Sequence, residues 1–221
     1  MNILRIFQKI KWEALAKLNP NYYVFSEEDS RDKEKYRQSG KRDFERYISS
    51  DRELGNFFKN SREKICLELG CGNGRMTEFL AGVFKLVWAI DISSEMIKLA
   101  KKRLSRFNNI EYLINSGEEI DLDDNSIDFI FSYAVLQHLP NKKMVKNILK
   151  EFYRIIKKNG LIKIQVRGKE SYGGVFRFLK WYYGVSFSGK EVRNILNKIG
   201  FEIISITGEG TKLLWLVMTK K

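Results

Sequence analysis

The sequence predicts an α/β fold with a mostly parallel sheet and helices on both faces. From residue 64 onward, apolar runs of strand length alternate with stretches of helical periodicity. Parallel strands need such crossover connections. Near the end of the chain, two strand-like runs are separated only by residues 208–211. That connection is short enough for a hairpin, so one antiparallel strand is expected in the sheet.

The first 60 residues depart from this pattern and are expected to form a helical extension. Apolar residues recur at helical spacing over 3–18, with basic residues largely on other faces, until Asn19-Pro20 ends the pattern. We expect this helix to pack on its own protein; a pocket lid and an acidic membrane surface are the alternatives. Residues 26–46 have mixed charge and little apolar content, which predicts a loop or a loosely held helix.

The strands and helices of the remaining chain follow one another in a regular order. Strands are expected at 64–69, 86–91, 110–115, 127–132, 160–166, 201–207 and 212–219. Helices are expected at about 75–84, 94–106, 142–157 and 189–199. The chain therefore divides into an extension or lid over 1–60 and one α/β domain over 61–221.

Composition excludes several classes of protein. The chain has 221 residues, of which 43% are hydrophobic and 13% aromatic, so it is not a disordered protein. It has no long apolar run and no signal-peptide pattern at its start, and a cytoplasmic location is expected. Cys66 and Cys71 are interpreted as free thiols. With His138 as the single histidine, no metal site is expected.

The net charge of +13 is unevenly distributed along the chain. Residues 141–221 carry 18 basic and 5 acidic side chains, whereas residues 61–140 carry 9 and 12. A basic field of this kind attracts an anionic partner. The alternative is that the lysines are simply solvated.

The stretch 67-LELGCGNGRMTEFL-80 contains three glycines on alternate positions, Gly70, Gly72 and Gly74. A glycine loop between a strand and a helix lets the backbone approach a ligand closely and points free N–H groups at it. Asp91 ends the second strand 17 residues beyond Gly74, where a carboxylate accepts hydrogen bonds from ribose hydroxyls. The ligand is therefore expected to contain a nucleoside.

Two other nucleotide-binding patterns fit less well. A dinucleotide fingerprint reads GxGxxG, but Arg75 stands where its third glycine would fall. The phosphate loop GxxxxGK[ST] is absent.

Four motifs in order resemble the class I S-adenosylmethionine-dependent methyltransferases, of the small-molecule type with a domain similar to methyltransferase domains 11 and 25. The resemblance covers residues 62–221. It rests on 68-ELGCGNG-74, 90-IDISSEMIKLAKKR-103, 124-DNSIDFIFSYAVLQHL-139 and 149-LKEFYRIIKKNGLIKI-164. It implies a Rossmann-like three-layer sandwich with a seven-stranded sheet whose last strand is antiparallel, and S-adenosylmethionine as the cofactor.

The resemblance also implies roles for single residues. The backbone of the loop would pack against the methionine and ribose portion of the cofactor while Glu68 braces it; Asp91 would hold the ribose hydroxyls, and Ile92 would lie against adenine. The implied cofactor-binding residues are Glu68, Gly70, Cys71, Gly72, Asn73, Gly74, Asp91, Ile92, Met96, Ser116, Gly117, Glu118, Ser132 and Tyr133. The family often has an acidic residue at the position of Ser116, so here Gly117 N–H and Glu118 are expected to recognise adenine.

Methyl transfer from a sulfonium needs few catalytic side chains, because the protein mainly aligns a nucleophile with the methyl–sulfur bond and excludes water. A hydroxyl or amine acceptor still has a proton to lose. His138 is the one histidine available as a base. The alternative is that His138 only lines the pocket or caps a helix.

The insert over 167–190 interleaves basic and aromatic side chains, which suits an acceptor that bears a carboxylate or phosphate. We expect a small or lipid-linked anionic acceptor, methylated on oxygen or nitrogen, beneath a lid formed by this insert and residues 1–50. Its candidate contacts are Arg167, Tyr172, Arg177, Trp181 and Tyr182. The alternative for the insert is that its aromatic rings form an ordinary helix–sheet seam. The alternative functions for the protein are an RNA methyltransferase and a cofactor-binding regulator. The oligomeric state is left open, as is contact of residues 1–18 with a membrane.

Overall fold

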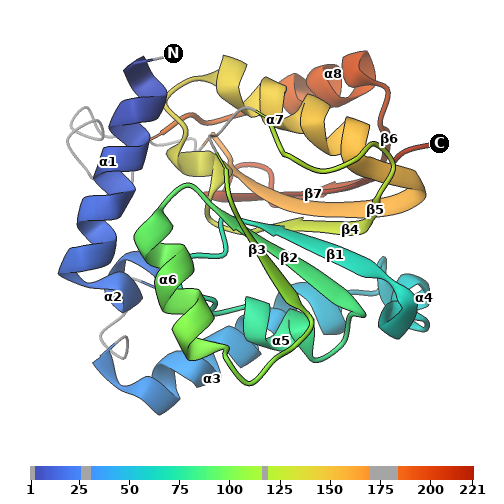
Figure 1. Cartoon of the computed structure of the whole chain (residues 1–221). Helices are drawn as coiled ribbons and strands as arrows, with labels where there is room; N and C mark the ends of the chain where they lie inside the picture. Colours follow the sequence, from blue (N-terminus) through green and yellow to red (C-terminus); the bar gives the residue numbers. More distant parts are fainter. Residues whose placement is uncertain (1–2, 26–30, 116–118, 170–183) are drawn as a thin grey trace. The chain divides into compact units, whose positions relative to one another are not determined.

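The computed structural model describes residues 3–25, 31–115, 119–169 and 184–221 (Figure 1). The chain forms two compact units, residues 1–116 and 117–221, and each is described by itself below. Their boundary lies inside the α/β domain expected over 61–221, so the division into an extension and a domain stays a prediction.

The first unit begins with helices. They are α1 (Ile3–Leu18), α2 (Pro20–Val24), α3 (Lys33–Phe44) and the short α4 (Gly55–Phe58). The expectation of a loop or loosely held helix over 26–46 is wrong for α3. Asp32 caps it by accepting a hydrogen bond from Lys35 N at 2.9 Å. Tyr36 and Phe44 are among its buried residues. Burial of these two aromatic rings stabilises a helix whose remaining sequence is mostly polar.

The expected packing of the apolar stripe of α1 is also wrong. The helix forms where predicted, but Ile3, Phe7, Ile10 and Leu18 are 62–78% exposed. The buried residues of α1 are Gln8 and Ala16. The helix is attached through its less apolar face, because a carboxylate on it binds the neighbouring helix, as described below.

The sheet of the first unit consists of three parallel strands. They are β1 (Ile65–Leu69), β2 (Leu86–Asp91) and β3 (Ile110–Ile114), with β2 between the other two. Along the chain, α5 (Thr77–Ala81) connects β1 to β2, and α6 (Ser94–Arg103) connects β2 to β3. Helix α1 runs alongside α6 in Figure 1. The core of this unit includes the fully buried Leu67, Val87 and Ile90. Cys66 and Cys71 are buried free thiols, as expected.

Helix α5 is shorter than the predicted helix at 75–84. The turns of the glycine loop continue to Met76, whose carbonyl accepts from both Phe79 N and Leu80 N, and Gly82 ends the helix. An α-helix of five residues offers little N-terminal dipole, so the loop itself must supply the N–H groups that were expected from the helix.

In its described residues, the second unit contains four strands and two α-helices. They are β4 (Ile127–Ser132), α7 (Lys142–Ile155), β5 (Ile156–Arg167), α8 (Gly189–Ile199), β6 (Glu202–Thr207) and β7 (Leu213–Thr219). Strand β4 is parallel to β5, and β7 is antiparallel to both β5 and β6. Ser188 and Glu191 form a capping box at α8, and Gly200 ends this helix in the left-handed conformation.

The strand order of the sheet is β3-β2-β1-β4-β5-β7-β6. The predicted mixed α/β sheet of seven strands with an antiparallel β7 and N-terminal helices is therefore confirmed, including the hairpin between β6 and β7. None of the helices in the described ranges is long and apolar enough to cross a membrane.

Candidate cofactor-binding site

The loop after β1 takes a shape that side chains would obstruct. Gly70, Gly72 and Gly74 all have positive φ, at 77°, 54° and 85°. A Cβ on Gly72 would lie 2.8 Å from Val24 Cγ2, and one on Gly74 would lie 2.6 Å from Leu104 Cδ1. The loop is joined to β2, since Gly70 N and Cys71 N both donate to the Ile90 carbonyl, at 2.7 and 3.0 Å.

Asp91, the last residue of β2, faces this loop. Its Oδ2 accepts a hydrogen bond from Gly72 N at 2.9 Å, and its Oδ1 accepts one from Ser93 N at 2.9 Å. Burial raises the pKa of Asp91 to about 6, although the backbone hydrogen bonds from Ser93 and Gly72 act in the opposite direction. The carboxylate therefore lies beside bare main chain at the ends of two adjacent strands.

Glu68 lies beneath the loop. Its Oε2 accepts from Thr77 Oγ1 at 2.5 Å, which links β1 to the first residue of α5. Burial raises the pKa of Glu68 to about 7, while the hydrogen bond from Thr77 and the charge of Arg75 lower it. Arg75 in turn forms an ion pair with Asp43 of α3, N to O at 2.7 Å.

The N-terminal helices contact the loop through residues that the sequence did not single out. Asn73 donates from Nδ2 to Asn21 Oδ1 at 2.7 Å and accepts at Oδ1 from the hydroxyl of Tyr36 at 2.7 Å. Val24 of α2 packs on Gly72. Tyr36 was recognisable only as one of two aromatic residues in a charged stretch; nothing in the sequence indicated Asn21.

A second missed residue is Glu13 of α1, which caps α6. Its carboxylate accepts four hydrogen bonds: from Ser93 Oγ at 3.0 Å, from Ser94 N and Oγ at 2.7 Å each, and from Glu95 N at 3.1 Å. Slight burial acts to raise the pKa of Glu13, but these hydrogen bonds outweigh it and lower the pKa. A negative charge at a helix N-terminus is favourable, so Glu13 joins α1 to the segment that follows Asp91.

The first unit thus brings together most of the predicted cofactor residues. Ile92 is half-buried beside Asp91, and Met96 belongs to the buried core at 1% exposed. Cys71 and Asn73 are buried within the loop. Ser116, Gly117 and Glu118 lie outside the described residues.

The second unit places its predicted residues at the ends of β4 and β5. Ser132 ends β4 fully buried, and the ring of Tyr133 stacks on Trp215 with centroids 5.4 Å apart. His138 is 7% exposed in a 3-10 turn over Leu136–His138. Arg167 ends β5 and is 9% exposed. The other predicted acceptor contacts, Tyr172, Arg177, Trp181 and Tyr182, lie outside the described residues.

The turn after β4 is held by a glutamine of β5 that was not predicted. Gln165 is fully buried; its Oε1 accepts from Ala134 N at 3.1 Å, and its Nε2 donates to the carbonyl of Val166 at 2.6 Å. Ala134 has a φ of 59°, in the left-handed region that non-glycine residues rarely adopt. Gln165 therefore supports a strained backbone four residues before His138.

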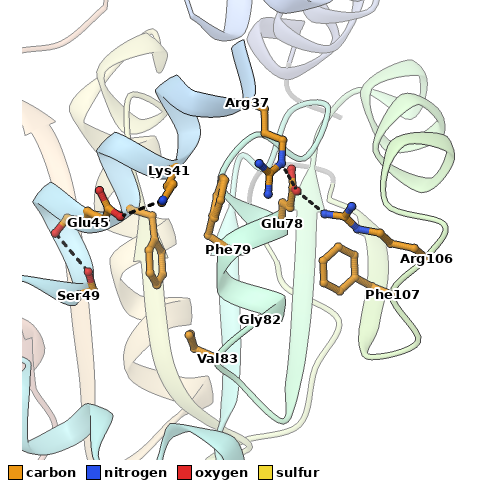
Figure 2. A pocket seen from close by; sticks show the side chains of 11 residues that line it. Arg37, Lys41, Glu45, Ser49, Glu78, Phe79, Gly82, Val83, Arg106 and Phe107 are labelled. Atoms are coloured by element: carbon orange, nitrogen blue, oxygen red, sulfur yellow. Dashed lines mark hydrogen bonds and ion pairs between the residues drawn. The ribbon is translucent and has the colours of Figure 1, made fainter. Parts of the chain in front are cut away.

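A cleft of about 360 Å³ lies in the first unit, and Figure 2 shows the side chains that line it. It is lined by Arg37, Lys41, Phe44, Glu45, Ser49, Glu78, Phe79, Gly82, Val83, Arg106 and Phe107. None of these is a predicted site residue. Burial alone would raise the pKa of Glu78, but the hydrogen bonds from Arg37 and Arg103 outweigh burial, and the pKa is lowered from its usual value. Glu78 also pairs with Arg106, so the cleft contains an ion cluster that joins α3 to α5 and the end of α6.

The fold and the loop together define a class of protein. A glycine loop after the first strand and a carboxylate at the end of the second are the nucleoside-binding elements of open α/β sheets. Residues 67–164 match the family model of a methyltransferase domain. The chain belongs to the class I S-adenosylmethionine-dependent methyltransferases, in which S-adenosylmethionine is the methyl donor.

The chain is similar in sequence to several proteins. An uncharacterised protein of Methanocaldococcus jannaschii is 33% identical over 147 residues, which are 64% of this chain and 66% of that protein. Phosphoethanolamine N-methyltransferase 2 of Caenorhabditis elegans is 30% identical over 142 residues, 61% of this chain and 32% of the enzyme. The chain thus spans between about a third and two thirds of the length of these relatives.

A solved structure shows the same fold over the whole chain. Magnesium protoporphyrin IX methyltransferase of Synechocystis, determined with bound S-adenosylmethionine, has a TM-score of 0.69 at 14% identity. The match covers 100% of this chain and 99% of that one.

Proposed function

We propose that this chain transfers a methyl group from S-adenosylmethionine to an oxygen or nitrogen of a small anionic acceptor. The observation that carries the proposal is the position of Asp91, a carboxylate facing the glycine loop at the end of β2.

Asp91 retains the capacity to bind a ribose while it braces the loop. A carboxylate offers about four acceptor positions. The main-chain N–H groups of Gly72 and Ser93 use two of them, and the N–H of Ile92 also interacts with the carboxylate. The remaining capacity suits the hydroxyls of a ribose. Ile92 would then lie against the adenine, and the backbone over 70–74 against the methionine portion.

The N-terminal extension supports this donor site as a lid. Val24, Asn21 and Tyr36 all contact Gly72 or Asn73, as described above. A lid that rests on the cofactor loop excludes water from the reacting groups. We therefore assign residues 1–60 to the cofactor site and propose that closure of this segment accompanies cofactor binding.

When bound, the cofactor supplies an activated methyl group. The acceptor's oxygen or nitrogen forms a bond to the methyl carbon as the carbon–sulfur bond breaks, and the acceptor's proton must leave. His138 would take that proton on a ring nitrogen. Its turn is fixed from within the second unit, because His138 N donates to the Val135 carbonyl at 2.9 Å.

Charge favours an anionic acceptor. Residues 141–221 hold 18 basic and 5 acidic side chains, and one face of β5 carries the buried cations Lys163 and Arg167. The acceptor named for the worm relative, phosphoethanolamine, contains a phosphate. We propose that Arg167 and the predicted insert contact such a group.

The experiment incubates the protein with methyl-labelled S-adenosylmethionine and fractionated cell extract. The expected result is label in the small-molecule or lipid fraction, with much less label transferred by Asp91→Asn when S-adenosylmethionine is limiting. Label in RNA, lost steeply as salt rises, would instead support the RNA alternative. Tight binding of the donor without label in any fraction would indicate a cofactor-binding regulator.

A further inference from the structure

Helix α1 exposes a continuous apolar stripe. Ile3, Phe7, Ile10 and Leu18 are 78%, 68%, 62% and 73% exposed, and Ala14 between them is exposed as well. Their spacing of three or four residues places them on one face of the helix, along roughly 22 Å of its length. Leu4 and Ile6 border this stripe at 41% and 37% exposed. Single exposed apolar residues are ordinary, but an aligned set of this size indicates a binding surface.

The outward orientation of the stripe is held by specific contacts. The four hydrogen bonds that Glu13 accepts from the start of α6 restrict rotation of α1 about its axis. Gln8 and Ala16 face the protein, although Gln8 is more polar than the residues left outside. If burial of apolar surface alone set its orientation, the helix would turn the apolar stripe toward the protein and Gln8 toward solvent. The exposed stripe is therefore available for another partner.

The charge of the helix indicates which partner fits. Arg5, Lys9, Lys11 and Lys17 are its basic residues, and its one acidic residue, Glu13, is occupied by α6. Lys9 and Lys17 are exposed. A second copy would bring the same positive charges together. A membrane with anionic headgroups complements the charge and accepts the apolar stripe at the same time.

We propose that α1 is an interfacial helix that docks this protein on an anionic membrane surface. The stripe Ile3–Phe7–Ile10–Leu18 lies in the boundary between headgroups and acyl chains, and Lys9 and Lys17 contact the headgroups. The proposal concerns a surface separate from the methyl-transfer chemistry, and it does not depend on the acceptor proposed above.

The test uses the full chain and sedimentation with lipid vesicles. One set contains phosphatidylglycerol with phosphatidylcholine, and the other contains phosphatidylcholine alone. Wild type is expected to bind the anionic vesicles at least about tenfold more tightly, and high salt is expected to weaken that binding. The double variant Phe7→Ser/Ile10→Ser is expected to lose roughly tenfold or more, because it removes two exposed apolar groups from the stripe.

A matched control removes two exposed apolar side chains elsewhere. Ile114→Ser/Ile204→Ser changes residues that are 49% and 44% exposed, and it is expected to bind like wild type. Lys9→Glu/Lys17→Glu is expected to lose the preference for anionic vesicles. Unchanged melting temperatures show that the variants fold.

Three outcomes would overturn the proposal. The first is absence of wild-type binding to anionic vesicles, and the second is equal binding by the stripe variant. The third is concentration-dependent dimerisation that Phe7→Ser/Ile10→Ser abolishes, without vesicle binding by wild type. That third result would assign the stripe to contact between copies of the chain.

Discussion

The end of β2 and the end of β4 are both turns at predicted functional positions, but they are built differently. At the end of β2, main-chain N–H groups of Gly72 and Ser93 hold Asp91, and glycines permit the backbone shape. At the end of β4, Ala134 adopts a positive φ and a side chain from another strand, Gln165, supports it. Main-chain contacts leave a glycine motif in the sequence, whereas side-chain contacts between distant residues leave none.

The largest effect is expected at the end of β4. His138→Ala should lower turnover about 100- to 10,000-fold, because a general base contributes that much when the acceptor must lose a proton. Cofactor affinity, measured by calorimetry, should stay nearly unchanged. Asp123→Asn, an exposed carboxylate of the same unit, serves as the control and should retain most of the activity. Equal turnover of His138→Ala and wild type would show that this histidine is not the base.

The corresponding change at the end of β2 should act on binding instead. Asp91→Asn should weaken S-adenosylmethionine binding by about 2–4 kcal/mol, or roughly 30- to 1000-fold, because two hydrogen bonds to a charged acceptor are weakened. Asp123→Asn, an exposed carboxylate, provides the control. If calorimetry finds that Asp91→Asn and wild type bind S-adenosylmethionine with equal affinity, Asp91 does not bind the ribose.

The pH dependence of binding sharpens the same point. Because burial raises the pKa of Asp91 to about 6, the free protein increasingly protonates the carboxylate proposed to bind the ribose as the pH falls below 6. Affinity should be full above about pH 7 and about tenfold weaker at pH 5. Folding responds in the opposite sense: an acid with a raised pKa binds its proton more tightly when folded, so its contribution to stability increases as pH falls from 7 toward 4.

The comparison that isolates this effect is between wild type and Asp91→Asn across the same pH range. Glu68, whose pKa burial raises to about 7, titrates in both proteins. A tenfold pH effect that persists in Asp91→Asn would therefore assign the dependence to another group.

Glu13→Gln tests whether the N-terminal extension contributes to the S-adenosylmethionine site. The variant should reduce the free energy of unfolding by about 1–2 kcal/mol, because the start of α6 loses a charged cap. Denaturant unfolding measures this change, with the exposed Glu111→Gln as control. Cofactor affinity should fall as well, since the cap adjoins Asp91. A stability loss with unchanged affinity would confine α1 to a structural role.

The smallest effect is expected from Ala134→Gly. Glycine relieves the positive φ of residue 134 but adds freedom to the unfolded chain, so a net gain of about 0.5–1 kcal/mol is expected. Ala14→Gly, in the interior of α1, should lose about 1 kcal/mol. Thermal melting of both variants measures the difference, and destabilisation by Ala134→Gly would show that the turn is not strained.

What could be predicted from the sequence follows the same division. The loop of Gly70–Gly74, Asp91 and the hairpin after β6 were predictable because each depends on nearby residues and on backbone geometry. Helix α3 was not, because Tyr36 and Phe44 stabilise it by burial in contacts distant in sequence. The bond from Asn73 to Asn21 spans 52 residues, and the direction of the α1 stripe depends on Glu13, 81 residues before Ser94.

The bond between Glu13 and Ser94 also has a consequence for biosynthesis. At typical translation rates, Glu13 emerges roughly 4–16 s before Ser94, the residue 81 positions later that it caps. A lone helix of 16 residues is only marginally stable in water, so α1 lacks its attachment to α6 during that interval. The position of α1 therefore depends on a segment that is synthesised later.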